Sequence, residues 1–505
     1  MKVQYAYPLF LSAGLTFGHD QRLLAKEDAL HACNSLADDF PGLVVFPHDP
    51  EYASQQNRYW ASNQADSQPN CRLVPRTSED VSSLISQLVH LEEGVKFAIA
   101  SGGHHTAEGA SNLDDGITLD LSGLDSIALA ADHSFVEVGT GARWLDVYQY
   151  LGPRGLMVSG ARVASVGVGG YLLGGGISIF ASQYGWSGDM VEAIELVLAN
   201  GTILESNETH HGRLSTALNG GGSNFGIATK FRLRTFPAQP LHMALLAFSP
   251  EQVPVLLHEL TTFARNAHVD PATSVDLSIG FDGAAAQPVY VLMLTHFGPR
   301  PDESSWKPFL EIPALFRSIQ QASLTEMAEM MEVNNPPGFR SHKVTFTVHN
   351  DAVILHQLAE LFTLAMQNSS LQVDGYFRAG ILVQPLTLPH MRYAQERGGA
   401  NFLGLDDEQE PLMLLSIEFR WLLRSHDQIY TTTLDTLLRR CEAIATSGAL
   451  LHPFRYINYA AAGQDAFALL RQRGHGHRLE EARMLRILYD PTGFFDRRLK
   501  SPFKI

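Results

Sequence analysis

The 505-residue chain has a formal net charge of −16, with 37 Lys and Arg residues against 53 Asp and Glu residues. Because no surplus of cations is available to neutralise phosphates, this charge argues against sequence-independent nucleic-acid binding and against stable association with anionic membranes. The length exceeds what one hydrophobic core usually spans, so we expect two domains.

The N-terminal stretch MKVQYAYPLFLSAGLTFGHD has one lysine followed by an apolar run with small residues near its end. This order is typical of a secretory signal peptide, although Gln4 and Pro8 interrupt it, and it predicts residues 1–18 as the signal. The alternative is a buried N-terminal segment. We therefore expect a protein that is secreted or enters the secretory pathway.

The three cysteines bear on the same expectation. An oxidising compartment permits a disulfide between Cys33 and Cys71, and it leaves Cys441, inside an amphipathic helical pattern, as a buried free thiol. Glycosylation sequons, which also arise by chance, begin at Asn200, Asn207 and Asn368.

The chain has three regions. From about residue 70 to 237, short strands alternate with helices and glycine loops, and LANGTI has the Asn-Gly pair of a β-hairpin. From 238 to 449, long helical patterns mix with strands such as PVYVLMLTHF, which indicates helices over an antiparallel sheet. Residues 450–505 add FRYINY and the helical pattern RLEEARMLRILY. The fold class expected is α+β.

Several kinds of site are excluded by spacing. The paired histidines are His104–His105, His210–His211 and His475–His477. Neighbouring residues on a strand point to opposite faces, so these pairs do not predict a metal site. No Gly-x-Ser-x-Gly motif is present. Two Gly-x-Gly starts place Trp144 and Leu172 where a dinucleotide fingerprint needs its third glycine, so neither is a Rossmann motif.

Three glycine-dense loops remain: FAIASGGHHTAEGASN at 97–112, GARVASVGVGGYLLGGGIS at 160–178 and NGGGSNFGIA at 219–228. Consecutive glycines expose backbone N–H groups and let the chain approach a ligand closely, which makes an anion-binding nest. A tight turn explains one such loop well. Three together favour a long ligand that carries a pyrophosphate.

The motif SGGH at 101–104, followed by Gly109 and Ser111, resembles the pyrophosphate loop of the vanillyl-alcohol oxidase and p-cresol methylhydroxylase (PCMH) flavoproteins, and more closely their berberine bridge enzyme-like branch. Further motifs match that branch in order: VASVGVGGYLLGGG, YGWSGDMVEAIELVLANGTI, LNGGGSNFGIATKFRLRTFP, YINY and LYDPTGFF. The resemblance covers roughly residues 30–505.

The resemblance implies a two-domain flavoprotein. Its PCMH-type FAD-binding domain spans 19–237, an antiparallel-sheet substrate domain covered by helices spans 238–449, and a C-terminal segment, 450–505, returns to the first domain. It also implies that the residues that hold FAD are Ser101, Gly102, Gly103, His104, His105, Gly109, Ser111, Val163, Ser165, Val166, Gly167, Gly170, Tyr171, Gly174, Ile227 and Asn458.

Among these residues, His104 is implied to bond covalently to the 8α-methyl group of FAD, whereas His105 points the other way and is structural. Val163 stands where doubly linked relatives have a cysteine that bonds the flavin C6, so a single covalent link is expected. Ala100 stands where the family often has an arginine, which implies the loss of one pyrophosphate or loop contact. Val166 occupies the implied O2-gating position, where valine is associated with oxidases.

Catalytic candidates come from two other segments and from Tyr171, which occupies a position often held by histidine. The strand LMLLSIEFRW places Glu418 and Arg420 on one side, together with Leu414 and Ser416. Among apolar neighbours Glu418 is expected to have a raised pKa and to act as general base; the alternative is a surface pair with Arg420. Two further residues are implied by the resemblance to face the flavin: Tyr456, to assist deprotonation of a substrate hydroxyl, and Asn458, to hydrogen-bond the ring.

The function expected is an FAD-linked oxidase that removes hydride from a C–H next to oxygen or nitrogen and reduces O2 to H2O2. The substrate is a small molecule such as an oligosaccharide, an alcohol or a specialised metabolite, and the apolar second domain slightly favours the last. The chain is expected to be a monomer without a metal. Alternatives are a dehydrogenase with another acceptor, a non-redox cyclase that retains FAD, and a carrier with a vestigial flavin site.

Overall fold

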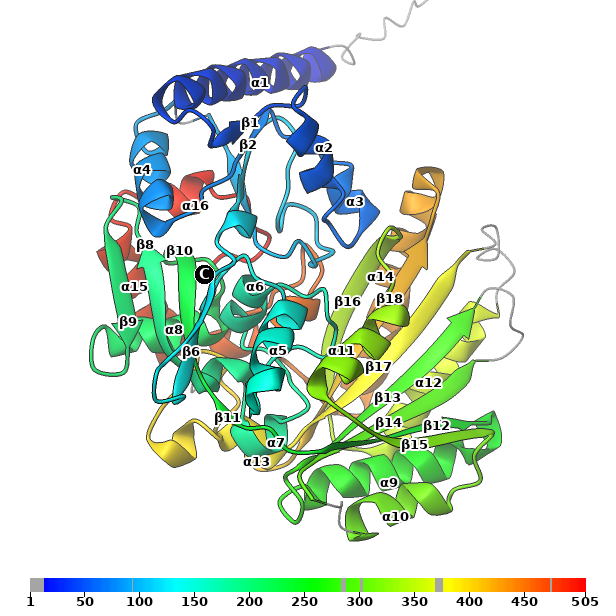
Figure 1. The fold of residues 1–505 in the computed structure, drawn as a ribbon. Coiled ribbons are helices and arrows are strands. Elements are labelled where there is room, and N and C mark those ends of the chain that lie inside the picture. Colours follow the sequence, from blue (N-terminus) through cyan, green and yellow to red (C-terminus); the bar gives the residue numbers. More distant parts are fainter. Residues whose placement is uncertain (1–12, 93, 283–287, 300–302, 368–375, 473–474) are drawn as a thin grey trace, which may run out of the picture.

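The structure is a computed structural model that describes residues 13–92, 94–282, 288–299, 303–367, 376–472 and 475–505. Two α+β domains lie side by side, and the C-terminal segment of the chain lies against the first (Figure 1). The expected α+β fold class, with two domains and an antiparallel sheet in the second, is confirmed.

The first domain contains two sheets. The four-stranded sheet has the order β1-β2-β4-β3, and its strands β2, β4 and β3 are parallel. The five-stranded antiparallel sheet has the order β5-β6-β10-β8-β9. The strands are β1 Val44–Val45, β2 Cys71–Leu73, β3 Phe97–Ala100, β4 Ile117–Asp120, β5 Ile127–Leu129, β6 Phe135–Gly139, β8 Val191–Val197, β9 Ile203–Asn207 and β10 Ile227–Arg234. The expected hairpin at LANGTI is confirmed as β8–β9.

The helices of this domain connect and cover the two sheets. They are α1 Ala13–Asp39, α2 Pro50–Gln56, α3 Ser62–Ala65, α4 Ser78–Leu88, α5 Trp144–Leu151, α6 Val168–Leu173, α7 Ala181–Tyr184 and α8 Gly212–Gly221. A capping box formed by Thr77 and Asp80 fixes the start of α4. A two-stranded ribbon, β7 (Leu156–Met157) with β11 (Phe236–Pro237), leads out of the domain.

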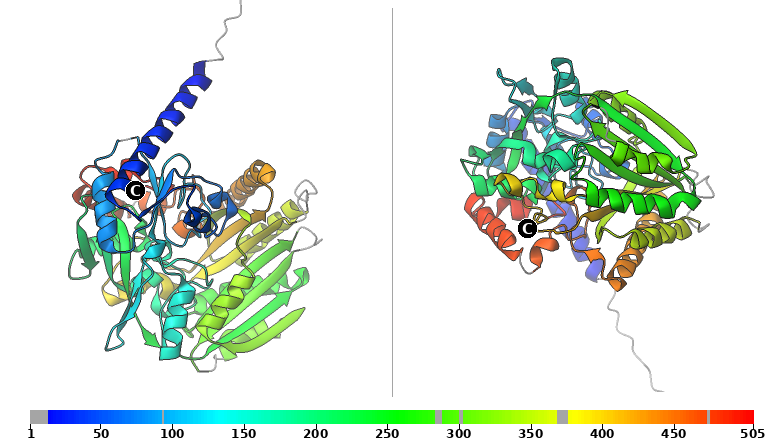
Figure 2. Two further views of the ribbon diagram at one scale, coloured as in Figure 1. Left: turned by 45° about the horizontal axis from the view of Figure 1, so that its top comes forward. Right: turned by 90° about the horizontal axis from the view of Figure 1, so that it is seen from below.

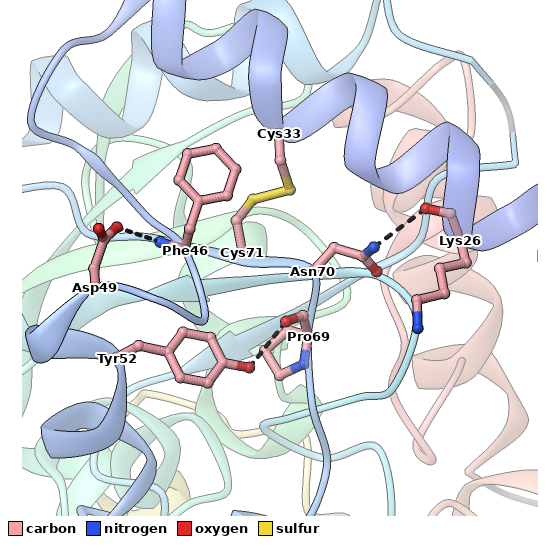
Figure 3. Close-up of a disulfide and its surroundings, with 8 residues drawn as sticks. All are labelled: Lys26, Cys33, Phe46, Asp49, Tyr52, Pro69, Asn70 and Cys71. Carbon is pink, nitrogen blue, oxygen red and sulfur yellow. Dashed lines mark hydrogen bonds between the residues drawn. A yellow bond between two sulfur atoms is a disulfide. The ribbon is translucent and has the colours of Figure 1, made fainter.

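A disulfide ties the long helix α1 to the four-stranded sheet. It joins Cys33 of α1 to Cys71 at the start of β2, and the side-chain amide of Asn70 donates to the carbonyl oxygen of Lys26 in the same helix at 3.2 Å (Figure 3). Cys441 is a buried free thiol in the second domain. The expected pairing and the expected free cysteine are both confirmed.

The second domain is one eight-stranded antiparallel sheet in the order β15-β12-β14-β13-β17-β18-β16-β19. Its strands are β12 Leu241–Phe248, β13 Thr273–Asp282, β14 Val289–Phe297, β15 Phe316–Ala322, β16 Arg340–His349, β17 Arg378–Leu386, β18 Leu412–Trp421 and β19 Leu451–His452. Helices α9 (Val253–Asn266), α10 (Glu303–Glu311), α12 (Ala352–Met366) and α14 (Asp427–Ser447) cover its outer face (Figure 1).

Side chains alternate along these strands, which separates a helix-covered face from a face directed at the first domain. On β13, Val275, Leu277 and Ile279 pack into the core beneath the helices. Asp276, Ser278 and Gly280 lie on the opposite face, which looks toward the glycine loops. Helix α11 (Leu324–Val333) packs against α5, and α13 (Leu388–Arg392) packs against α7, so both bridge the domains.

The C-terminal segment returns to the first domain. Helices α15 (Gly476–Tyr489) and α16 (Phe494–Arg498) carry apolar residues into its cores, and the amide of Lys500 donates to the carbonyl oxygen of Phe97 at 2.6 Å. The segment YINY, which matches a closing strand in the family it resembles, does not form a strand in this protein. Pairing ends after β19, and the backbone turns at Tyr456 into a short 3₁₀ helix, Ile457–Tyr459.

The expected signal peptide, residues 1–18, lies mostly outside the described residues and stays a prediction. From Ala13 onward the chain is already helical, and α1 projects from the first domain toward its N-terminal end (Figure 2). The sequon at Asn368 also lies outside the described residues. In the described part of the chain, no helix combines the length and the apolarity that crossing a membrane would need.

Candidate functional site

A cavity of about 760 Å³ lies between the glycine loops and the inner face of the large sheet. Its walls come from three parts of the chain: the three glycine loops of the first domain, strands β13, β14, β16, β17 and β18 of the second, and the C-terminal stretches around residues 456–459 and 501–503. Sequence segments that are hundreds of residues apart therefore meet in one site.

The glycine loops pack backbone against backbone. A Cβ atom added to Gly102 would lie 2.4 Å from the Cα of Gly167, and one added to Gly169 would lie 2.1 Å from Oγ1 of Thr140. Only glycine permits such an approach. At Gly170 an added Cβ would meet no atom of the described residues within 4 Å, so this stretch of backbone is open to the cavity.

The candidate attachment residue, His104, lies on the cavity wall. Its ring stacks on Trp60, with centroids 4.8 Å apart and planes 21° from parallel. Burial, followed by the charges of Lys343, Arg143 and Arg420, lowers the pKa of His104 well below its usual value, so the imidazole is neutral. Its Nε2 has no hydrogen-bond partner among the described residues.

His105 makes different contacts, although it also borders the cavity. Its Nε2 lies 3.1 Å from the carbonyl oxygen of Ile457, and its Nδ1 accepts a hydrogen bond from the amide of Ala107 at 3.1 Å. Burial lowers its pKa to about 4. Both ring nitrogens are used within the protein, which agrees with the expected structural role.

Glu418 faces the cavity from β18 and is surrounded by cations. Its carboxylate accepts a hydrogen bond from the hydroxyl of Ser341 at 2.6 Å and lies 3.7 Å from Nζ of Lys343 and 3.9 Å from Nε of Arg420. Burial acts to raise its pKa, but these two charges and the hydrogen bond outweigh it and hold the pKa of Glu418 below its usual value.

Two expectations about Glu418 are therefore wrong. Its pKa is lowered rather than raised. The expectation failed because the strand pattern shows the apolar neighbours of Glu418 but not Lys343, which lies opposite it on the next strand. The pair with Arg420 does not lie on the outer solvent face, because both residues line the cavity. Its role as a base stays a prediction, now of an ionised carboxylate.

A buried ion pair joins the two domains at the cavity. The guanidinium of Arg162, in the second glycine loop, hydrogen-bonds the carboxylate of Asp276 on β13 and donates to the hydroxyl of Tyr459 at 3.1 Å. Gln384 donates to the other oxygen of Asp276 at 2.9 Å. This network fixes the second loop relative to the sheet.

The three remaining catalytic and ring-facing candidates lie together. The amide of Asn458 donates to the hydroxyl of Tyr456 and to the carbonyl oxygen of Tyr171, both at 3.0 Å. Burial raises the pKa of both tyrosines well above the usual value, so both hydroxyls stay protonated. The hydroxyl of Tyr171 lies 3.0 Å from Oγ of Ser187, which continues into a buried chain of serine hydroxyls through Ser159.

Most of the candidate site residues come together at this cavity. Glu418 and Tyr456 line it, as do Ser101, Gly102, Gly103, His104, His105, Ser111, Val163, Val166, Gly167, Gly170, Tyr171, Gly174, Ile227 and Asn458. Gly109 and Ser165, both among the described residues, do not. Gly109 packs beside the side chain of Lys500, and Ser165 donates its amide and hydroxyl to Glu332 of α11.

Sequence reasoning missed Trp60, Arg162, Lys343 and Tyr459, which all line the cavity. Trp60 precedes every recognised motif. Its ring stacks on the His104 ring, and the guanidinium of Arg420 lies 4.3 Å from its centroid. Lys343 is the register partner of Glu418. Knowledge that β16 pairs with β18 would have identified Lys343 as a neighbour of Glu418, but the sequence alone does not predict that pairing.

The residues present fit a bound FAD. Unpartnered polar atoms, Nε2 of His104 and Oγ of Ser111, are buried at the cavity within the described residues. The close backbone contact of Gly102 with Gly167 leaves N–H groups without side chains to cover them, as a pyrophosphate requires. These loops would hold the cofactor's phosphates.

Comparisons with known proteins agree with this assignment. The FAD binding domain family matches residues 69–207. The FAD-dependent monooxygenase tpcD of Cochliobolus heterostrophus is 33% identical over 472 residues, which cover 91% of this chain and 90% of the relative.

Among solved structures, the berberine bridge enzyme-like protein 1 of Physcomitrella patens superposes with a TM-score of 0.73 at 17% identity, covering 93% of this chain and 98% of the other. Glucooligosaccharide oxidase from Acremonium strictum, described with a 6-S-cysteinyl, 8α-N1-histidyl FAD, has a TM-score of 0.75 at 18% identity, covering 94% and 99%. The chain therefore belongs to the family of FAD-dependent oxidoreductases that includes the fungal FAD-dependent monooxygenases, and it has the two-domain fold of the berberine bridge enzyme-like flavoproteins.

Proposed function

We propose that the protein is an FAD-linked oxidase of a small organic substrate, with its flavin attached through His104 alone. The observation that carries the proposal is the neutral, buried imidazole of His104 at a cavity walled by glycine backbone on one side and by polar side chains on the other. A neutral imidazole has the free electron pair that bond formation to carbon requires.

The single attachment rests on Val163. This residue borders the cavity in the second glycine loop, and a valine side chain has no nucleophilic atom. The described residues contain one free cysteine, Cys441, which is buried in the core of the second domain. A second thioether link, as described for glucooligosaccharide oxidase, therefore has no donor here.

When bound, FAD would accept a hydride from the substrate and return two electrons to O2 as hydrogen peroxide. The chain's own residues orient the substrate and control its protons. Glu418 is ionised and can accept a proton, whereas the hydroxyls of Tyr171 and Tyr456 stay protonated and donate hydrogen bonds. The pairing of Arg162 with Asp276 keeps the two walls together.

A second candidate follows from the relative's name. The protein tpcD of Cochliobolus heterostrophus is called a monooxygenase, which would place one oxygen atom of O2 in the product. Both candidates consume O2 after substrate has reduced the flavin. They differ in where the oxygen goes. The oxidase sends both atoms to hydrogen peroxide, whereas the monooxygenase sends one atom to the organic product and the other to water.

Anaerobic mixing of the holoenzyme with candidate substrates tests the redox proposal. We expect bleaching of the flavin absorbance, followed on aeration by one hydrogen peroxide per oxidised substrate. Incorporation of ¹⁸O from ¹⁸O2 into the product would instead establish the monooxygenase. Turnover without bleaching would establish the non-redox cyclase. Reduction of the flavin without a reaction with O2 would establish a dehydrogenase, and binding without turnover would establish a carrier.

We also propose that the protein passes through the secretory pathway. The bridge between Cys33 and Cys71 supports this, since such bonds persist in oxidising compartments. Expression with the native N-terminus in a fungal host, followed by assay of the medium and N-terminal sequencing, tests it. Full-length protein retained in the cytosol with both thiols free would contradict it.

A further inference from the structure

The substrate side of the cavity is rich in positive charge, although the chain as a whole has a net charge of −16. The charged side chains that line the cavity are Arg162, Asp276, Lys343, Arg378, Glu418 and Arg420. Asp276 pairs with Arg162. Glu418 is one carboxylate between two cations, Lys343 and Arg420.

Arg420 is held in place before any ligand arrives. Its side chain is 9% exposed, its guanidinium lies 4.3 Å from the centre of the Trp60 ring, and one of its terminal nitrogens donates to the carbonyl oxygen of Pro336 at 3.4 Å. Its buried Nε has no hydrogen-bond partner within the described part of the chain. A buried guanidinium with an unused donor is costly unless an acceptor binds there.

The strand register places a second arginine opposite it. Arg378 on β17 is the direct cross-strand partner of Arg420 on β18, and its charge contributes to the lowered pKa of Arg420. Like charges directly opposite each other destabilise a sheet. The register therefore places both arginines on the cavity face of the sheet.

The same sheet face is bare next to these cations. Gly280 of β13 and Gly380 of β17 are register partners, and both line the cavity. A Cβ atom on Gly280 would meet no described atom within 4 Å, and one on Gly380 would have only the carbonyl oxygen of Ile279 nearby, at 3.5 Å.

Protein packing therefore does not require glycine at either position. Glycine inside a strand weakens it and often marks a place where a ligand approaches the backbone. On β17, Gly380 follows Arg378 by two residues, about 7 Å along the strand, and its own cross-strand partner on β18 is Glu418. The bare floor and the two arginines are therefore one ring length apart.

We infer that the substrate side of the cavity binds a planar organic anion, an aromatic or conjugated acid whose carboxylate or phenolate lies against Arg420 and Lys343 and whose ring lies over Gly280 and Gly380. That this anion is the substrate rests on the proposed function. That an anion binds here does not, because it depends only on residues of the sheet.

Calorimetric titration of the holoenzyme with cinnamate and with its neutral analogue cinnamamide tests the charge. We expect cinnamate to bind at least about tenfold more tightly, as a charge-assisted hydrogen bond implies. Arg420→Gln should remove this preference and leave cinnamamide binding unchanged, while Arg420→Lys should restore part of it. Equal affinities for the two probes, or no cinnamate binding up to about 10 mM, would overturn the inference.

Two further variants complete the test. Arg317→Gln, at an exposed arginine on edge strand β15 of the same sheet, is the matched control and should change neither affinity. Gly280→Ala should weaken both probes about tenfold by occupying the floor, whereas Gly476→Ala, at another glycine with open space, should weaken neither. An unchanged affinity in Gly280→Ala would show that the ring does not lie there.

Flavin reduction is recorded separately in the same samples. Charge-selective binding without bleaching by any oxidisable aromatic acid would preserve the anion site and refute the proposed oxidase. Bleaching by neutral substrates, with no preference for cinnamate over cinnamamide, would support the proposed oxidase and refute the anion site.

Discussion

The two walls of the cavity are built from different material. The cofactor wall is backbone, since the loops around Gly102 and Gly167 meet with almost no side chain between them. The substrate wall is made of side chains on a regular sheet, with Glu418, Lys343 and Arg420 set by strand register. A backbone wall has little freedom to vary, whereas a sheet face can exchange side chains without changing the fold. On the proposed function, the first wall holds the cofactor and the second selects the substrate.

Removal of His104 should have the largest effect on the cofactor wall. In His104→Ala we expect complete loss of covalent flavin, because Val163 provides no second attachment atom. Denaturation in acid followed by absorbance of the pellet and supernatant checks this, with wild type retaining its yellow colour in the pellet. The control is His105→Ala, which should keep the covalent link because His105 contacts Ile457 and Ala107 instead. Colour retained by precipitated His104→Ala protein would refute a single link.

The disulfide stabilises the cofactor side only, since it ties α1 to the sheet that carries the first glycine loop. Cys33 and Cys71 are 38 residues apart in sequence, so replacing both by alanine should lower the free energy of unfolding by about 3–4 kcal/mol on the chain-entropy account. Guanidinium unfolding followed by far-UV circular dichroism measures it. Cys441→Ala, in the core of the other domain, is the control and should cost roughly 1 kcal/mol. Equal losses would show that the bridge adds nothing beyond packing.

The cofactor wall was largely predictable from sequence because its signal is local. The motifs that carry the family resemblance, such as 101–104 and 167–170, are short and local. The candidates that this resemblance implied line one cavity, with Gly109 and Ser165 as exceptions. Ser165 was misplaced because its partner, Glu332, lies 167 residues further along the chain. No local pattern records that contact.

The substrate wall was predicted only in part. Strand alternation correctly put Glu418 and Arg420 on one face, but the pKa of Glu418 depends on Lys343 across the sheet. Trp60 lies outside every motif, and Arg162 lies in the second glycine loop but was not among the candidates. The contacts of both residues follow from the meeting of the two domains. The alternation of side chains along a strand predicts which face of the sheet a residue lies on. Its electrostatic environment can be predicted only when the register of the neighbouring strands is known.

Two glycines of the cofactor wall separate backbone packing from cofactor contact. Gly102→Ala places a Cβ against the backbone of Gly167, so we expect it to lower the free energy of unfolding by about 2 kcal/mol, as overpacked sites do. Gly170→Ala meets no described atom within 4 Å and should not destabilise the flavin-free protein, since alanine is favoured over glycine inside helix α6. Thermal unfolding of both variants with and without flavin decides it. A stability loss of equal size in flavin-free Gly170→Ala would mean that both glycines serve packing alone.

The smallest effect is expected at Val166, which lies on the cofactor wall and is half-buried at the cavity. Its backbone already serves the fold, because its carbonyl oxygen accepts the amide of Trp144 at 3.0 Å, so a change of side chain leaves that contact intact. The family resemblance associates valine here with access of O2 to the flavin. One added methylene can fill a space as small as O2 needs, since packed interiors have few spare voids.

We expect Val166→Leu to slow reoxidation of the reduced flavin about tenfold, equivalent to roughly 1.4 kcal/mol in activation free energy, with little change in anaerobic reduction. Stopped-flow mixing of photoreduced enzyme with oxygenated buffer measures the first rate without any substrate, so the result does not depend on how the other wall binds its ligand. Equal oxygen rates in the two proteins would remove the gate from the cofactor wall, and a slow rate in wild type would make the enzyme a dehydrogenase.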